Sequence, residues 1–193
     1  LEMLSNSSRN LSQMKQRTER LFDERIGALP KKVYMLGAEY TPLEFAHSVC
    51  MRGEYLAMTS FTHHRFGEAF VLEVPDNYSN ELYYNVPIDV MMKRIERSLR
   101  TGHPVCWEGD TSELGFDFKR GVAELTKQRP YTQKQRQIEF ENHHTTDDHC
   151  MVLIGIAHDE NGKRYYIAKN SWGTGNQYGG LMYLSEQYVM MKT

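Results

Sequence analysis

The sequence has little cysteine and no long apolar run, and both absences narrow the class of protein. Its three cysteines are Cys50, Cys106 and Cys150. They include no Cys-x-x-Cys pair, so they provide neither a disulfide framework nor a zinc site of the usual spacing. The longest apolar run, Met151 to Ala157, is far too short to cross a bilayer. The first residues show no signal-peptide pattern, and the cellular compartment stays open.

The composition also lacks a strong charge of either sign. The formal net charge is −2, which gives no support for binding nucleic acid or an anionic membrane through the whole surface. The hydrophobic fraction of 40% and the charged fraction of 25%, over 193 residues, fit an ordinary soluble protein with its own core. Neither an internal repeat nor a low-complexity tract is present. Function must therefore be sought in a local site.

The first two thirds of the chain contain signals for several helices, with short strands between them. A polar helix with a thin apolar stripe is expected from about Ser8 to Gly27. Thr41, Pro42 and Glu44 form a capping box that opens a helix to about Met51. The remaining expected elements are helices over residues 87–100 and 132–142, strands over residues 55–60, 69–74 and 104–108, and a loop over residues 109–130.

The final third reads as mostly β-structure. Two strands, His149–Ala157 and Arg164–Asn170, are joined by a hairpin turn over residues 159–162. A glycine-rich loop over residues 173–180 precedes a third strand, Leu181–Leu184. Helices first and an antiparallel sheet last predict an α+β fold. The expected organisation is an N-terminal helical arm over residues 1–30 and a single β-rich domain over residues 31–193.

Two polar residues at the ends of adjacent strands suggest a catalytic pair. His149 enters one strand and Asn170 leaves the next, so the two can face each other across the hairpin. An imidazole can take a proton from a thiol, and a carboxamide oxygen can orient the ring without carrying charge. Trp172 would shield this hydrogen bond from water. Each residue alone is more often structural than catalytic.

Strand alternation predicts which side chains share a face with His149. Asp147, Met151 and Leu153 fall on its face, whereas Cys150, Val152, Ile154 and Ile156 fall on the opposite one, expected to be the core face. Cys150 is therefore expected to be a buried packing residue. Asp147 is a hypothetical anchor for a substrate α-amine, and a solvated carboxylate is the alternative interpretation.

These residues resemble a known family. His149 before an apolar strand, followed by Asn170-Ser171-Trp172-Gly173, is similar to the His and Asn segments of papain-like cysteine peptidases. The chain more closely resembles the bleomycin hydrolase and aminopeptidase C branch, especially its Bacteroidetes-type members. The stretches that carry this closer resemblance are residues 40–45, 59–64, 73–77, 107–110 and 145–149.

The resemblance implies a fold, a reaction and an incomplete site. The fold would be the antiparallel sheet or barrel half of a papain-like peptidase with peripheral helices. The reaction would be cofactor-free peptide hydrolysis through a thioester, with His149 as base and acid and Asn170 as its orienter. The family's nucleophilic Cys lies roughly 130–150 residues before its His. Counting back from His149 reaches the chain's start, where no Cys exists.

The chain is therefore expected to be the C-terminal half of such an enzyme, with no nucleophile of its own. It also ends before the C-terminal tail that enforces aminopeptidase action in this branch. The expected partners are a peptide substrate, a Cys-bearing N-terminal half or chain, and further copies of itself. Neither nucleic acid nor a membrane is expected as a partner.

Three alternatives stay open. Cys106 or Cys50 could be a nucleophile, although a strand residue and a helix end are the simpler interpretations. The chain could be a binding scaffold that keeps the peptidase fold without turnover. It could also bind a metal through a cluster of imidazoles and carboxylates, namely His143, His144, Asp147, Asp148 and His149.

Overall fold

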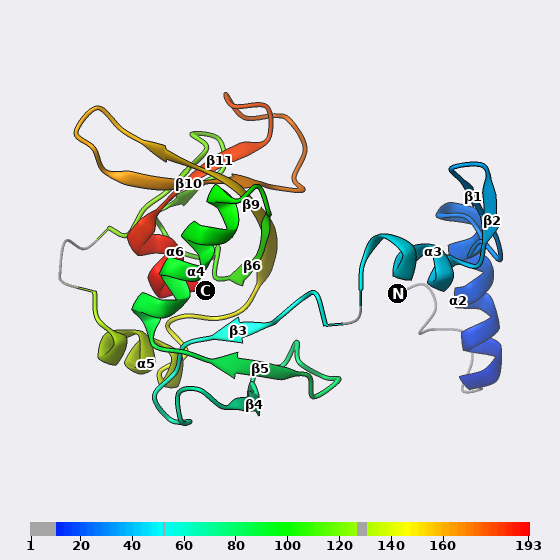
Figure 1. Ribbon diagram of the computed structural model, residues 1–193, viewed down its shortest axis with the longest axis horizontal. Coiled ribbons are helices and arrows are strands. Elements are labelled where there is room, and N and C mark those ends of the chain that lie inside the picture. Colours follow the sequence, from blue (N-terminus) through cyan, green and yellow to red (C-terminus); the bar gives the residue numbers. More distant parts are fainter. Residues whose placement is uncertain (1–10, 52, 127–130) are drawn as a thin grey trace. The chain divides into compact units, whose positions relative to one another are not determined.

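The computed structural model describes residues 11–51, 53–126 and 131–193 of the chain (Figure 1). The chain divides into two compact units, Leu1–Tyr55 and Leu56–Thr193, and each is described by itself. The expected division into an arm over residues 1–30 and a domain over residues 31–193 remains a prediction.

The first unit contains two helices and a small hairpin. Helix α2 spans Leu11–Arg25, strands β1 and β2 span Val33–Met35 and Ala38–Tyr40, and helix α3 spans Pro42–Val49. The predicted start of the first helix at Ser8 lies outside the described residues. The capping box is confirmed, because the Thr41 N–H donates to Glu44 Oε2 over 2.7 Å while the Glu44 N–H donates to Thr41 Oγ1 over 3.3 Å.

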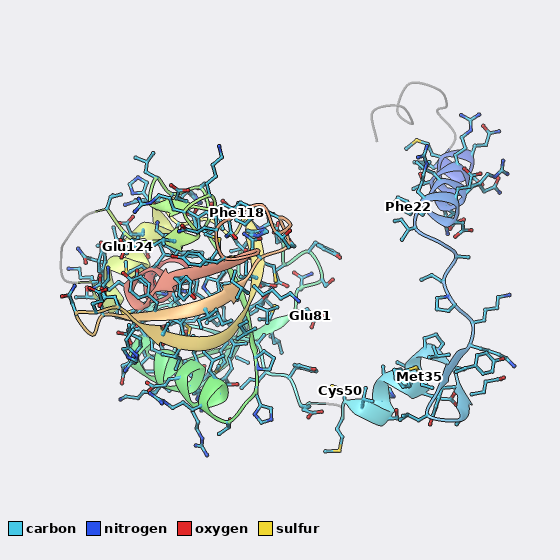
Figure 2. All side chains as sticks on the ribbon, turned by 90° about the horizontal axis from the view of Figure 1, so that it is seen from above. Phe22, Met35, Cys50, Glu81, Phe118 and Glu124 are labelled. Carbon is cyan, nitrogen blue, oxygen red and sulfur yellow. The ribbon has the colours of Figure 1, made fainter. Side chains whose placement is uncertain are left out.

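The apolar stripe of α2 remains open to solvent. No residue of α2 is buried, and the Phe22 side chain is 53% exposed (Figure 2). Leu11 and Ile26 at its two ends are still more exposed. This agrees with the expected thin apolar face, and a helix with such a face gains little stability from its own unit.

The second unit is built on two sheets. The larger sheet has the strand order β6-β9-β10-β11-β8-β7, and the smaller one has the order β3-β5-β4. The pairs among β6, β9, β10 and β11 are antiparallel, as expected, whereas β8 pairs with β11 in parallel and β3 pairs with β5 in parallel. The bounds are β3 Met58–Thr59, β4 Ala69–Val71, β5 Leu82–Asn85, β6 Val105–Gly109, β7 Phe116–Asp117, β8 Val122–Ala123, β9 His149–His158, β10 Arg164–Lys169 and β11 Leu181–Ser185.

Helices α4 (Ile88–Arg100), α5 (Gln133–Glu141) and α6 (Glu186–Lys192) complete the second unit. Helix α4 lies against β6 and β9 and buries Met91, Met92 and Ile95 against the sheet (Figure 1). The helical spacing of these apolar residues predicts this contact face. The sheet contributes Trp107, Met151, Leu153, Tyr166, Ala168, Met182 and Leu184 to the same core.

The predicted core face of β9 is wrong. Met151 and Leu153 are buried, whereas Cys150, Val152 and Ile154 are exposed. The alternation itself is correct, but both faces of this strand carry apolar side chains, so the sequence does not show which face α4 covers. Cys150 consequently does not have the buried packing role that was expected of it.

Several elements differ from the sequence-based expectation. The loop expected over residues 109–130 contains the two-residue strands β7 and β8, while residues 127–130 lie outside the described part. Strands β1, β2 and β5 and helix α6 were not predicted, and strands β3 and β4 are shorter than expected. Among the described helices, none has the length and apolar character needed to span a membrane.

Gly109 provides a test of how closely β6 is packed beside His149. It pairs with His149 across β6 and β9. A Cβ at this position would overlap the Lys192 carbonyl oxygen and the Trp107 ring. Gly109→Ala is therefore expected to lower the free energy of unfolding by about 1–3 kcal/mol or more, as overpacking does, measured by urea denaturation.

Gly175→Ala is the matched control, because a Cβ there would meet no atom within 4 Å. It is expected to change the free energy of unfolding by less than about 1 kcal/mol. Equal effects of the two substitutions would show that β6 is not closely packed at Gly109.

Candidate functional site

The structure brings His149 and Asn170 into direct contact. His149 begins β9, and Asn170 directly follows β10, whose Lys169 pairs with Val152 of β9. Residues placed diagonally on an antiparallel pair lie within reach of long side chains. The His149 Nε2 atom lies 2.9 Å from Asn170 Oδ1. The geometry predicted from the two strand ends is therefore present.

The surroundings of Asn170 identify the tautomer of His149. The Ser171 N–H donates to Asn170 Oδ1 over 2.7 Å, and Asn170 Nδ2 donates to Met182 Sδ over 3.4 Å. The atom that faces His149 is thus the amide oxygen, an acceptor, so the His149 Nε2 atom must carry the hydrogen. This leaves the Nδ1 lone pair free to accept a proton. Asn170 is only 7% exposed, which fixes the carboxamide in place.

Trp172 lies beside the histidine ring. The two ring centroids are 4.8 Å apart with an angle of 35° between the planes. Phe116 and Phe118 meet the indole edge-on at centroid distances of 5.6 Å and 5.4 Å, and so hold it in position (Phe118 is labelled in Figure 2). Trp172 remains 48% exposed, so its outer side faces solvent in this chain.

The loop that follows Asn170 turns back sharply to keep this arrangement. Its Gly180 has a φ of +91°, in the region that favours glycine, and a Cβ there would meet the Gly173 carbonyl oxygen at 2.7 Å. The Asn170 N–H donates to the Gly180 carbonyl oxygen over 3.2 Å. The two ends of the glycine-rich loop are thereby joined next to the carboxamide.

An acidic pocket adjoins His149. It is lined by residues 76–79, Glu81, Tyr83, Glu108 and residues 147–150. Burial raises the pKa of Asp147 to about 6, with further contributions from the carboxylates of Glu108, Asp76 and Asp148. Burial, followed by the charge of Glu108, raises the pKa of Tyr83 to about 12. The pocket is thus a place where negative charge is concentrated.

Asp147 lines this pocket together with His149, but its other neighbours were missed. Glu108 and Tyr83 come from β6 and β5, and a hydrogen bond of 3.3 Å joins them. Their proximity to Asp147 depends on the pairing of β6 with β9, which no local pattern specifies. The alternation of β6 alone would have indicated only that Glu108 shares a face with Cys106.

Three residues of the hypothetical metal cluster, His144, Asp148 and His149, have separate contacts. Asp148 Oδ1 accepts hydrogen bonds from the N–H and the hydroxyl of Thr111, and His149 bonds to Asn170. His144 Nδ1 lies 3.7 Å from Glu139. Within the described residues, the group with ligand-like geometry is instead His63, His64 and Glu73.

The hydrogen bonds of His63 disfavour a metal at that second group. Gln137 Oε1 accepts from the Thr62 N–H, and its Nε2 donates both to Glu141 and to His63 Nδ1, over 2.9 Å each. His63 Nδ1 is thus an acceptor, so the hydrogen lies on Nε2 and is directed at Glu73, 3.1 Å away. A metal at Nε2 would require the opposite tautomer.

None of the three cysteines contacts His149 through a hydrogen bond in the described part of the chain. Cys106 is a strand residue, as expected, and its thiol contacts that of Cys150. Cys50 lies at the C-terminal end of α3 (Figure 2).

Comparisons of the sequence and the structure with known proteins identify relatives among the peptidases. The chain is 26% identical over 155 residues to aminopeptidase E of Lactobacillus helveticus, a match that covers 74% of this chain and 35% of that protein. It superposes on the crystal structure of PepW from Lactobacillus rhamnosis HN001 with a TM-score of 0.64 at 16% identity, covering 94% of this chain and 46% of the other. The chain thus spans less than half the length of both relatives.

A bromelain protease from Ananas comosus, solved with the E64 inhibitor, matches over 51% of this chain and 36% of its own, with a TM-score of 0.33 at 20% identity. That overlap is too small to support an argument. The sequence profile of the Peptidase C1-like family, in contrast, matches residues 30–191. With its papain-like α+β fold and a match over most of its length, the chain belongs to the Peptidase C1-like family.

Proposed function

We propose that this chain provides the His and Asn half of a cysteine-type aminopeptidase. The observation that carries this function is the hydrogen bond between His149 Nε2 and Asn170 Oδ1, which leaves Nδ1 as the proton acceptor. Membership of the Peptidase C1-like family and relatedness to an aminopeptidase support the reaction class.

His149 would act first as a base and then as an acid. Its Nδ1 accepts the proton of a thiol, and the thiolate attacks the peptide carbonyl carbon. The imidazolium then protonates the leaving amine, so that a thioester remains on the enzyme. Water activated by the same nitrogen hydrolyses that thioester. Throughout, Asn170 would hold the ring so that Nδ1 stays directed at the sulfur.

Trp172 would protect the hydrogen bond that orients the ring. A hydrogen bond shielded from water is electrostatically stronger than one in contact with solvent. The indole already covers one side of His149, at 4.8 Å between centroids. Its exposed outer side leaves room for a further segment of the enzyme or for the substrate.

The nucleophile would come from a segment outside this chain. The chain covers 35% of aminopeptidase E and 46% of PepW, so most of each relative has no counterpart here. Cys150 is the cysteine nearest to His149 in sequence, and Cys106 lies on the strand paired with it. The two free thiols form a hydrogen bond with each other. A separate Cys-bearing segment would complete the site.

Asp147 and its pocket would favour substrates with a free N-terminus. The half-buried carboxylate lies next to other acidic groups and two residues before His149. With a pKa of about 6 it is ionised at pH 7 and above. A peptide α-amine has a pKa of about 8 and is therefore mostly protonated up to that pH. Attraction between the two charges would therefore operate mainly between about pH 6 and 8.

The orienting role of Asn170 is tested by Asn170→Ala in the enzyme assembled with its Cys-bearing segment. Loss of a buried hydrogen bond that leaves its partner unsatisfied costs about 1–3 kcal/mol, which corresponds to a fall in kcat/KM of about 5- to 150-fold. Most of the loss should be in kcat, because the bond positions the ring rather than the substrate.

The control is Asn161→Ala, in the exposed turn between β9 and β10. It should leave both kinetic constants unchanged. Unchanged activity of Asn170→Ala, with the fold intact by circular dichroism, would remove the mechanism proposed for His149.

The amine-binding role of Asp147 is tested by Asp147→Asn in the same enzyme. The substitution should lower kcat/KM about tenfold or more for peptides with a free N-terminus, the size expected for a charge-assisted hydrogen bond, and much less for N-blocked peptides. In the wild type, the ratio of the two efficiencies should fall as the pH is lowered through about 6, and Asp147→Asn should abolish that dependence.

Loss of stability should not complicate this test. The folded state raises the pKa of Asp147 above its ordinary value, so ionisation of this group destabilises the fold as the pH rises through about 4 to 6. Asp147→Asn should then be at least as stable as the wild type at pH 7–8. Asp89→Asn on the exposed face of α4 is the control. Equal effects on free and blocked peptides would rule out the amine contact.

A further inference from the structure

Two free cysteines lie in contact beside the candidate site. Cys106 and Cys150 belong to the paired strands β6 and β9, and their Sγ atoms are 3.2 Å apart. Both residues are exposed, on the face of the sheet opposite to the buried Met151 and Leu153. The register pairs Glu108 with Cys150 and Cys106 with Val152, so the two thiols are diagonal neighbours.

The separation of the two sulfurs is small enough for a covalent bond to form with little motion. A disulfide requires an S–S distance of about 2.03–2.05 Å, so the sulfurs need to approach by roughly 1.2 Å. Side-chain rotation and a small shift of neighbouring strands can supply such a change. Because both strands are already hydrogen-bonded to each other, the two thiols are held together without a large loss of chain entropy.

We propose that Cys106 and Cys150 are a redox-active pair that closes to a reversible disulfide by exchange with a small-molecule disulfide of the glutathione class. The pair adjoins the proposed substrate pocket, but its oxidation does not depend on the chain being a peptidase.

The chemistry assigns an order to the two thiols. Although Cys150 is exposed as a residue, its thiol is partly desolvated by the surrounding strands. This desolvation, followed by the hydrogen bond and charge of Cys106 and then by Glu108, raises the pKa of Cys150 to about 12, so its thiolate is scarce. Cys106 would therefore attack first. Its thiolate displaces one thiolate from the oxidised glutathione and forms a mixed disulfide at Cys106.

Cys150 would then resolve the mixed disulfide. Its sulfur attacks Cys106 Sγ and releases the second glutathione thiolate. The two protons lost by Cys106 and Cys150 are taken up by the two glutathione thiolates, so the protein pair is oxidised by two electrons and the glutathione disulfide is reduced by two. Once Cys106 carries no negative charge, its own contribution to the raised pKa of Cys150 is gone.

The pair is placed where its state would affect the pocket. Cys150 follows His149 directly and lines the acidic pocket together with Glu108 and Tyr83. Closing the disulfide would link β6 covalently to β9 next to His149 and Glu108. It would also replace two thiols that can rotate with one covalent bridge.

The test is thiol counting and peptide mapping of the native chain after incubation, at low protein concentration, with oxidised glutathione. The wild type has three thiols and is expected to lose two, with a linked Cys106–Cys150 peptide in the digest and full recovery on reduction. Cys50→Ser is the matched control and should form the same bridge. Cys150→Ser should stop at one glutathione adduct on Cys106, and Cys106→Ser should leave Cys150 unmodified.

Peptide mapping of the wild type tests the proposed disulfide even if a variant fails to fold. Retention of all three thiols, separate glutathione adducts on both cysteines without a link, or disulfides between chains would each overturn the inferred pair.

Discussion

The candidate site of the second unit depends on one hydrogen bond, that between the His149 imidazole and the Asn170 carboxamide. Its direction is set by a backbone group: the Ser171 N–H occupies the same oxygen and so prevents the amide from turning. The bond joins the start of β9 to the end of β10, and Trp172 packs on it. A neutral orienter leaves the ring able to gain and lose a proton, as a base and acid must.

The side of β9 away from α4 carries exposed apolar side chains and free thiols. Helix α4 covers Met151 and Leu153, whereas Val152 and Ile154 are exposed together with Cys106 and Cys150. The exposed apolar strand face, the open side of Trp172 and the acidic pocket lie in the second unit, and the whole chain covers 46% of PepW. In our account, a further segment that supplies the nucleophile would cover part of this surface.

Local patterns in the sequence predicted local structure well. The capping box at Thr41 and the apolar spacing of α4 depend on residues a few positions apart, and both are confirmed. The contact of His149 with Asn170 could be predicted because the hairpin brings the start of β9 beside the end of β10, although the register shift between Ile167 and Ala168 could not. The core face of β9 could not be predicted, because both faces of this strand carry apolar side chains. The pairing of Glu108 with Cys150, and with it the acidic pocket and the thiol pair, depends on strands far apart in the chain.

The most direct test of the central claim is the tautomer of His149, measured by long-range ¹H–¹⁵N NMR correlation on the chain at a pH where the ring is neutral. Our account predicts that the hydrogen resides on Nε2, with Nδ1 unprotonated, and that this preference weakens when the Asn170 carboxamide is removed. A hydrogen on Nδ1, or a tautomer that does not respond to loss of the carboxamide, would contradict it.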